Sequence, residues 1–131
     1  MLGIREPGIY GKETFSDLLA LLEQTAKELD VQIEQYQSNH EGCLVDKIQQ
    51  ALGCFDGIVI NPAAYTHTSI AILDALKAVS IPAVEVHISD IDAREPFRRI
   101  SYAGMACVKT IKGQGLDGYR QAIRFLKENY G

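Results

Sequence analysis

The chain has 131 residues, 47% of them hydrophobic and 23% charged, and a formal net charge of −4, which fits one globular domain over residues 1–131 with a buried core. We expect no membrane anchor, because no apolar run reaches the roughly 20 residues that a membrane helix needs and the start lacks the basic-then-apolar layout of a secretory signal. The acidic balance also disfavours a nucleic-acid partner, since phosphate binding requires concentrated Lys and Arg, so we expect a soluble, cytoplasmic protein.

The first predicted element is a helix from Thr14 to Leu29, where apolar residues recur at helical spacing and Thr14 can cap the start. Its apolar stripe consists of Phe15, Leu18, Leu19, Leu22, Ala26 and Leu29. The next residues, 31–36, alternate in polarity and predict a strand. Ser38 and Asn39 then offer caps for a second helix. The buried face of that helix would hold Leu44, Ile48, Ala51 and Leu52.

Three more strands and two more helices are predicted after residue 56. In chain order they are a strand at 57–60, a helix at 69–79, a strand at 82–87, a strand at 107–111 and a helix at 117–129. The inward face of the last helix would hold Tyr119, Ile123 and Leu126. Strands that alternate with helices of ten or more residues indicate βαβ units and a parallel sheet, so the sequence predicts an α/β fold.

The first predicted helix does not fit this alternation, because no strand comes before it. A right-handed crossover helix needs a strand before it as well as after it, and no strand precedes residue 14. In a doubly wound sheet of five strands in the order 2-1-3-4-5, the first strand lies inside the sheet. Its absence would therefore leave a gap in the sheet rather than a frayed edge.

Two predicted strands end in polar side chains, on the side where such sheets bind ligands. Asn61 follows the strand at 57–60, and His67 and Ser69 follow it before the next helix, whose free backbone N–H groups would favour an anion. Glu85 and His87 end the strand at 82–87 and share one of its faces, so the carboxylate can orient the ring. The second pair suits general acid–base chemistry.

Each of these features also has a purely structural interpretation. A histidine on a strand is often a hydrogen-bonded structural residue, Asn61 can serve as a turn former, and Ser69 as a helix cap. His40 is best interpreted as a solvent-facing residue near a helix start. What favours function is that polar groups end two strands on the ligand-binding side.

The cysteines and histidines predict neither a disulfide framework nor a metal site. Cys43, Cys54 and Cys107 are odd in number and lack CxxC spacing, which is typical of reduced thiols in a cytosolic protein. The histidines lack ligand spacing, and the nearest pair, His67 and His87, lies in different structural units.

Five segments together resemble type II 3-dehydroquinate dehydratase, in order and over nearly the whole chain. They are REPGIYG, QSNHEG, NPAAYTHTSIAILDAL, EVHISDIDAREPFRRISY and IKGQGLDGY. The resemblance implies a flavodoxin-like three-layer α/β sandwich, with trimers assembled into a dodecamer. It also implies the reversible loss of water from 3-dehydroquinate to give 3-dehydroshikimate, in the shikimate pathway or in quinate breakdown, with no metal or organic cofactor.

The resemblance assigns the chemistry to two pairs of residues. Tyr10 would be the base that removes a proton from substrate C2, and Arg5 would activate it. A tyrosine with its ordinary pKa of about 10 is a poor base at neutral pH, and a nearby cation in a closed, dry site favours the phenolate. The loop that holds both would be a lid over the substrate. His87, oriented by Glu85, would protonate the departing C1 hydroxyl of the enolate.

The remaining site residues would bind the substrate. Asn61 and the backbone N–H groups of Ile88 and Ser89 would hold its carboxylate. His67 and Arg98 would bind its ring hydroxyls. Asp74 would reach in from a neighbouring subunit of the trimer, and Arg94 would support a neighbouring lid or the interface, so that the site depends on assembly.

The chain also departs from the family pattern. Family members begin with a strand and an NGPNLN motif just ahead of the lid, whereas Met1 stands where that motif would be ending. We therefore expect that Met1 is an internal methionine and that the natural protein begins about a dozen residues earlier. Ala63 stands where glycine is common, Asp90 replaces the usual asparagine, and Asp92 replaces a frequent histidine.

Two alternatives to an active dehydratase stay open from the sequence. One is a catalytically impaired homologue that binds the same ligand without turnover, because the first strand and its loop are missing. The other is a flavodoxin-type cofactor or signalling module, which the fold alone would allow. No Gly- or Thr-rich phosphate loop for FMN is present to favour the latter.

Overall fold

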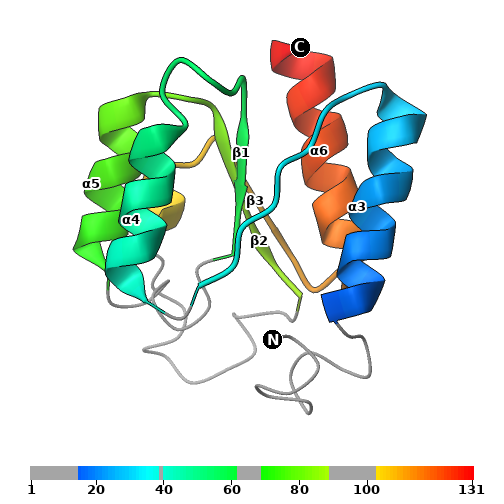
Figure 1. Cartoon of the computed structure of the whole chain (residues 1–131), viewed down its shortest axis with the longest axis horizontal. Coiled ribbons are helices and arrows are strands. Elements are labelled where there is room, and N and C mark those ends of the chain that lie inside the picture. Colours follow the sequence, from blue (N-terminus) through cyan, green and yellow to red (C-terminus); the bar gives the residue numbers. More distant parts are fainter. Residues whose placement is uncertain (1–14, 39, 62–68, 89–102) are drawn as a thin grey trace.

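The structure is a computed structural model that describes residues 15–38, 40–61, 69–88 and 103–131 (Figure 1). Several residues singled out from the sequence lie outside the described residues. They are Met1, Arg5, Tyr10, Thr14, Asn39, Ala63, His67, Ser89, Asp90, Asp92, Arg94 and Arg98.

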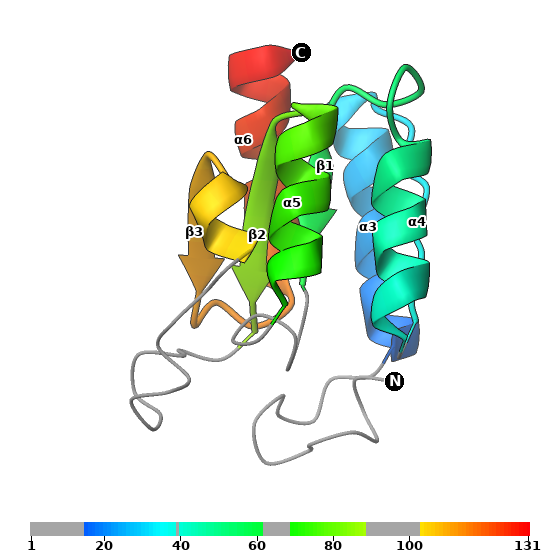
Figure 2. The same cartoon turned by 90° about the vertical axis from the view of Figure 1, so that its left-hand side faces the viewer.

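The described part is an α/β fold with a parallel sheet between two helical layers, as predicted. Its elements are α3 (Phe15–Leu29), α4 (Glu41–Gln50), β1 (Ile58–Ile60), α5 (Ile70–Val79), β2 (Ala83–His87), the 3₁₀ helix η4 (Ala103–Ala106), β3 (Lys109–Lys112) and α6 (Asp117–Tyr130). Helices α4 and α5 cover one face of the sheet, and α3 and α6 cover the other (Figures 1 and 2). The four predicted helices and three of the four predicted strands are thereby confirmed.

The three described strands are parallel and lie in the order β1-β2-β3. This is the arrangement of the last three strands in the expected order 2-1-3-4-5. In the register of the sheet, Ile60 lies opposite Glu85, and Glu85 lies opposite Thr110. The carboxyl ends of β1 and β2 therefore lie at the same edge of the sheet.

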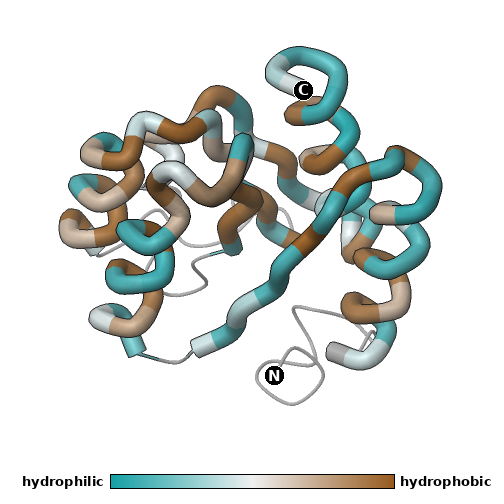
Figure 3. The backbone as a smooth tube through the Cα atoms, turned by 45° about the horizontal axis from the view of Figure 1, so that its top comes forward, coloured by the Kyte–Doolittle hydropathy of each residue, from teal (hydrophilic) through white to brown (hydrophobic). Residues whose placement is uncertain are grey.

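The strand predicted at 31–36 does not form, and this prediction was wrong. Residues 31–38 run from α3 to α4 past β1 without joining a ladder, and their polarity alternates along the trace (Figures 1 and 3). A strand exists only when a neighbour accepts and donates its backbone hydrogen bonds. In the expected order, strand 1 would lie between this segment and β1, and the described residues contain no strand there.

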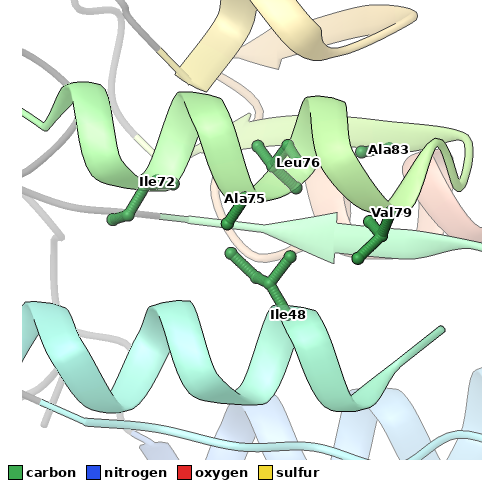
Figure 4. Close-up of a cluster of buried hydrophobic side chains, with 6 residues drawn as sticks. All are labelled: Ile48, Ile72, Ala75, Leu76, Val79 and Ala83. Atoms are coloured by element: carbon green, nitrogen blue, oxygen red, sulfur yellow. The ribbon is translucent and has the colours of Figure 1, made fainter.

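The hydrophobic core has one cluster on each face of the sheet. On one face, α4 and α5 pack on β2 through Ile48, Ile72, Ala75, Leu76, Val79 and Ala83 (Figure 4). On the other face, α6 covers a cluster of Val84, Val86, Ile111 and Ala122. Successive strand residues face opposite sides, so Glu85 and His87 point to the side of Ala83. Tyr119 and Leu126 pack against the α6 cluster, which confirms two residues of the predicted inward face.

Details at the helix ends correct two further predictions. Leu52 is 62% exposed because α4 ends at Gln50, so this residue no longer lies on the helical stripe. Ser38 does not cap α4: its hydroxyl accepts the backbone N–H of His40, which is the N-cap residue. By contrast, Ser69 caps α5 as predicted, since its side chain accepts the N–H of Ile72. Within α3, the predicted apolar stripe is only partly covered, because Leu19 is 38% exposed.

Candidate active site

The centre of the candidate site is a buried pair at the end of β2. Glu85 is 0% exposed and His87 is 5% exposed, and every residue of β2 is buried. The Nε2 atom of His87 lies 3.3 Å from Oε1 of Glu85. This contact is electrostatic rather than a hydrogen bond, because Nε2 lacks an aligned partner among the described residues. The geometry brings together the acid–base pair that the sequence predicts, inside the fold and away from bulk water.

The neighbouring strand β3 supports the carboxylate of this pair. The Thr110 hydroxyl donates a hydrogen bond of 3.2 Å to Oε1 of Glu85, directly across the ladder. A buried carboxylate needs such donors because its desolvation is costly. No motif in the sequence indicates Thr110, because its position beside Glu85 follows from the register between β2 and β3.

The Cys107 thiol lies close enough to Glu85 to respond to its charge. Burial first, and the negative charge of Glu85 second, raise the pKa of Cys107 to about 12. The thiol therefore stays protonated at neutral pH, and a protonated thiol is a poor nucleophile. The raised pKa therefore argues against a nucleophilic role for Cys107.

Asn61 lies at the neighbouring strand end, immediately after β1. Its Nδ2 donates a hydrogen bond of 3.1 Å to the Tyr119 hydroxyl in the first turn of α6. Ile88, directly after β2, is buried and packs with Leu18 and Leu116. Its carbonyl accepts the N–H of Gly115 at 3.0 Å, which fixes the backbone just past His87. Asn61, His87 and Ile88 thus converge on one edge of the sheet.

Asp74 is set apart from this group. It lies on α5 between buried residues Leu73 and Ala75, and its own side chain is exposed. Five other predicted site residues lie outside the described residues: Arg5, Tyr10, His67, Ser89 and Arg98.

Within the described ranges, no group of three or more His, Cys, Asp or Glu side chains is placed to hold a metal ion. No helix in those ranges is long and apolar enough to cross a bilayer.

Comparison with known proteins identifies the family. The model of the family "Dehydroquinase class II" matches residues 1–127. The 3-dehydroquinate dehydratase of Geotalea daltonii is 56% identical, over 96% of this chain and 88% of the relative. The catabolic 3-dehydroquinase of Verticillium alfalfae is 53% identical, over 95% of this chain and 83% of the relative.

A solved structure agrees with the sequence relatives. The type II dehydroquinase from Butyrivibrio crossotus superposes with a TM-score of 0.92 at 52% identity, covering 95% of this chain and 88% of that chain. Both the fold and the family resemblance inferred from the motifs are thereby confirmed. The chain belongs to the class II dehydroquinase family.

Proposed function

We propose that this protein catalyses the reversible dehydration of 3-dehydroquinate to 3-dehydroshikimate, by anti elimination through an enolate. The observation that carries the proposal is the buried Glu85–His87 pair at the ligand-binding edge of a sheet shared with named dehydroquinases. Relatives about half identical to the chain are named as dehydratases, which does not support the alternative of an impaired homologue. Matches include enzymes named catabolic, so quinate breakdown and the shikimate pathway are both compatible roles.

In the proposed mechanism, His87 is the general acid. Tyr10, activated by Arg5, removes a proton from C2, and the resulting enolate expels the C1 hydroxyl as His87 supplies the proton that makes it water. Since Nε2 faces Glu85, Nδ1 is the nitrogen left to face the substrate. The fixed negative charge of Glu85 orients the ring, and the Thr110 hydrogen bond holds that carboxylate in place.

Substrate binding is proposed for the residues around this pair. Asn61 and the backbone N–H groups of Ile88 and Ser89 would hold the carboxylate, and His67 and Arg98 the ring hydroxyls. The positions of Asn61 and Ile88 at the same sheet edge as His87 support this assignment. The reaction needs no metal or organic cofactor, because a base and an acid suffice for the elimination.

We also propose that the chain is a single cytoplasmic domain that assembles into trimers and then a dodecamer, with Asp74 completing a neighbour's site. Asp74 is exposed on α5, and Ile70, one helical turn earlier on the same face, is 56% exposed. A large apolar side chain beside a surface carboxylate is the pattern expected of a subunit contact. Sedimentation of the purified protein would measure the mass of the assembly.

The general-acid role can be tested by the conjugated product's ultraviolet absorbance. His87→Asn should lower kcat by about 10²–10⁴-fold, the usual contribution of a positioned acid. His40→Asn is the matched control, because His40 is exposed and its side chain caps nothing on α4. Equal turnover by the two variants, with both folded by circular dichroism, would contradict the proposed role.

A further inference from the structure

The loop between β3 and α6 holds the end of β2 through the N–H groups of two glycines. Gly113 donates a hydrogen bond of 3.2 Å to the carbonyl of His87, and Gly115 donates one of 3.0 Å to the carbonyl of Ile88. Both glycines have positive φ, +75° and +60°, a backbone conformation that other residues rarely adopt. The mechanism above assigns the Ile88 N–H to the substrate carboxylate but gives this loop no task.

These two hydrogen bonds break the alternation of the strand. Successive carbonyls of a strand point to opposite edges, so a regular continuation of β2 would turn the Ile88 carbonyl toward the end of β1. Instead, the carbonyls of His87 and Ile88 both bind the same loop. A planar trans peptide carries its C=O and its N–H on opposite sides. The peptide groups that follow His87 and Ile88 therefore both direct their N–H away from the loop.

The first of these N–H groups, that of Ile88, has no hydrogen-bond acceptor among the described residues. Ile88 is 6% exposed, and β1, whose carbonyls would accept this N–H in a longer ladder, ends at Ile60. An N–H on a buried residue that lacks an acceptor costs about as much free energy as a lost hydrogen bond, so it points to an acceptor from outside the fold. Two successive N–H groups suit a carboxylate, which accepts through two oxygens.

We propose that Gly115 is a positioning residue that builds the carboxylate site by holding the Ile88 carbonyl, so that two successive N–H groups past His87 face the substrate. This inference rests on the proposed function, because it assigns those groups to the carboxylate of 3-dehydroquinate. The hydrogen bond from Gly115 also polarises the peptide and strengthens the N–H on its other side. The carboxylate does not react, so its contacts stabilise substrate and transition state alike, and weaker contacts raise KM with kcat nearly unchanged.

The test removes only the N–H of Gly115, by replacing its amide nitrogen with an ester oxygen. Cys107 makes this replacement accessible, because the chain before it, as a thioester, can be ligated to a synthetic peptide that begins with this cysteine. The matched control is the same replacement at Gly131, whose N–H donates at 3.1 Å to the Lys127 carbonyl at the far end of α6. Each variant thus loses one backbone hydrogen bond donated by a glycine.

We expect the Gly115 ester to raise KM for 3-dehydroquinate about three- to tenfold, the usual effect of one hydrogen bond, with kcat within about twofold of the ligated, unaltered chain. The Gly131 ester should leave both constants unchanged. Denaturant unfolding should show similar losses of stability in the two esters, which separates the effect on KM from a general weakening of the fold. An unchanged KM in the Gly115 ester, a loss confined to kcat, or an equal rise of KM in the Gly131 ester would overturn the inference.

Calorimetric binding of 3-dehydroshikimate distinguishes this inference from the proposed function. If the ligated, unaltered chain has no turnover but binds this compound, weaker binding in the Gly115 ester alone supports the inference while the proposed function fails. Turnover together with equal binding by the two esters contradicts the inference alone. A chain that neither turns over substrate nor binds product contradicts both.

Discussion

β2 and the segment at 31–36 are both short stretches with strand-forming residues, and each follows a helix, but they lie in different surroundings. All five residues of β2 are buried, and the strand pairs with β1 on one side and β3 on the other. None of residues 31–36 is buried, and none joins a ladder. A strand-forming sequence thus becomes a strand only where neighbours complete its hydrogen bonds, and here those same neighbours bury Glu85 and His87.

The largest expected difference between these regions is in amide hydrogen exchange. The amides of Val84 and Val86 should exchange at least about a thousandfold more slowly than those of Ile33 and Glu34, because core strands open only with near-global unfolding and unpaired segments open almost freely. Exchange followed by mass spectrometry on overlapping peptides would measure this. Equal protection would show that residues 31–36 are paired in solution, which contradicts the comparison.

Thiol reactivity extends the comparison to side chains. A pKa of about 12 against an ordinary 9.0 leaves Cys107 with about a thousandfold less thiolate, partly offset by higher intrinsic nucleophilicity, so we expect labelling about thirtyfold slower than at Cys43 and Cys54. Cys43 and Cys54 are both exposed. Labelling at pH 8 with peptide mapping would measure the rates. If Cys107 is labelled as fast as the two exposed thiols, its thiol is not buried beside Glu85 and the prediction is wrong.

The pKa of Cys107 also gives stability a pH dependence. The folded-state pKa lies above the unfolded value, so the unfolded chain loses this proton first as pH rises. The contribution is fully present below pH 9.0 and is lost progressively between about 9 and 12. Denaturant unfolding of Cys107→Ala should therefore show a shallower loss of stability over that window than the unaltered chain. Parallel curves for the two proteins would contradict it.

A matched pair of core truncations compares the packing directly. Val84→Ala should lower the free energy of unfolding by about 2 kcal/mol, from lost methyl burial plus the cavity left behind, since Val84 is 0% exposed. The same change at the half-buried Val31 should cost less than about 1 kcal/mol. Urea denaturation would give both values. Similar costs at the two sites would mean that residues 31–36 are packed as tightly as β2.

The smallest effect is expected at Lys47, which links α4 to the unpaired segment. Its ammonium forms an ion pair with Glu34 and lies 5.5 Å from the centroid of the Tyr36 ring. Glu34 and Tyr36 are both exposed, so Lys47→Met should cost less than about 1 kcal/mol of stability while speeding amide exchange at residues 33–36. Unchanged exchange in this variant would show that Lys47 does not hold the segment.

Much of this architecture was predictable from local patterns. Helical spacing predicts α3 and α6, and the period of two in β2 predicts that Glu85 and His87 share one face of the sheet. The strand wrongly predicted at 31–36 and the contact of Thr110 with Glu85 have the same cause of failure. Pairing partners and cross-sheet contacts depend on residues tens of positions away, and local pattern carries no information about them.

The proposed mechanism is best tested by asking whether the 131-residue chain converts 3-dehydroquinate, with product absorbance as the assay and the variants Tyr10→Phe and Tyr36→Phe beside it. We expect turnover by the unaltered chain and by Tyr36→Phe, whose exposed ring has no role in the proposed site, and a loss of at least about a hundredfold in Tyr10→Phe. Undiminished turnover in Tyr10→Phe would contradict the proposed base. A folded chain with no turnover would contradict the proposed function itself.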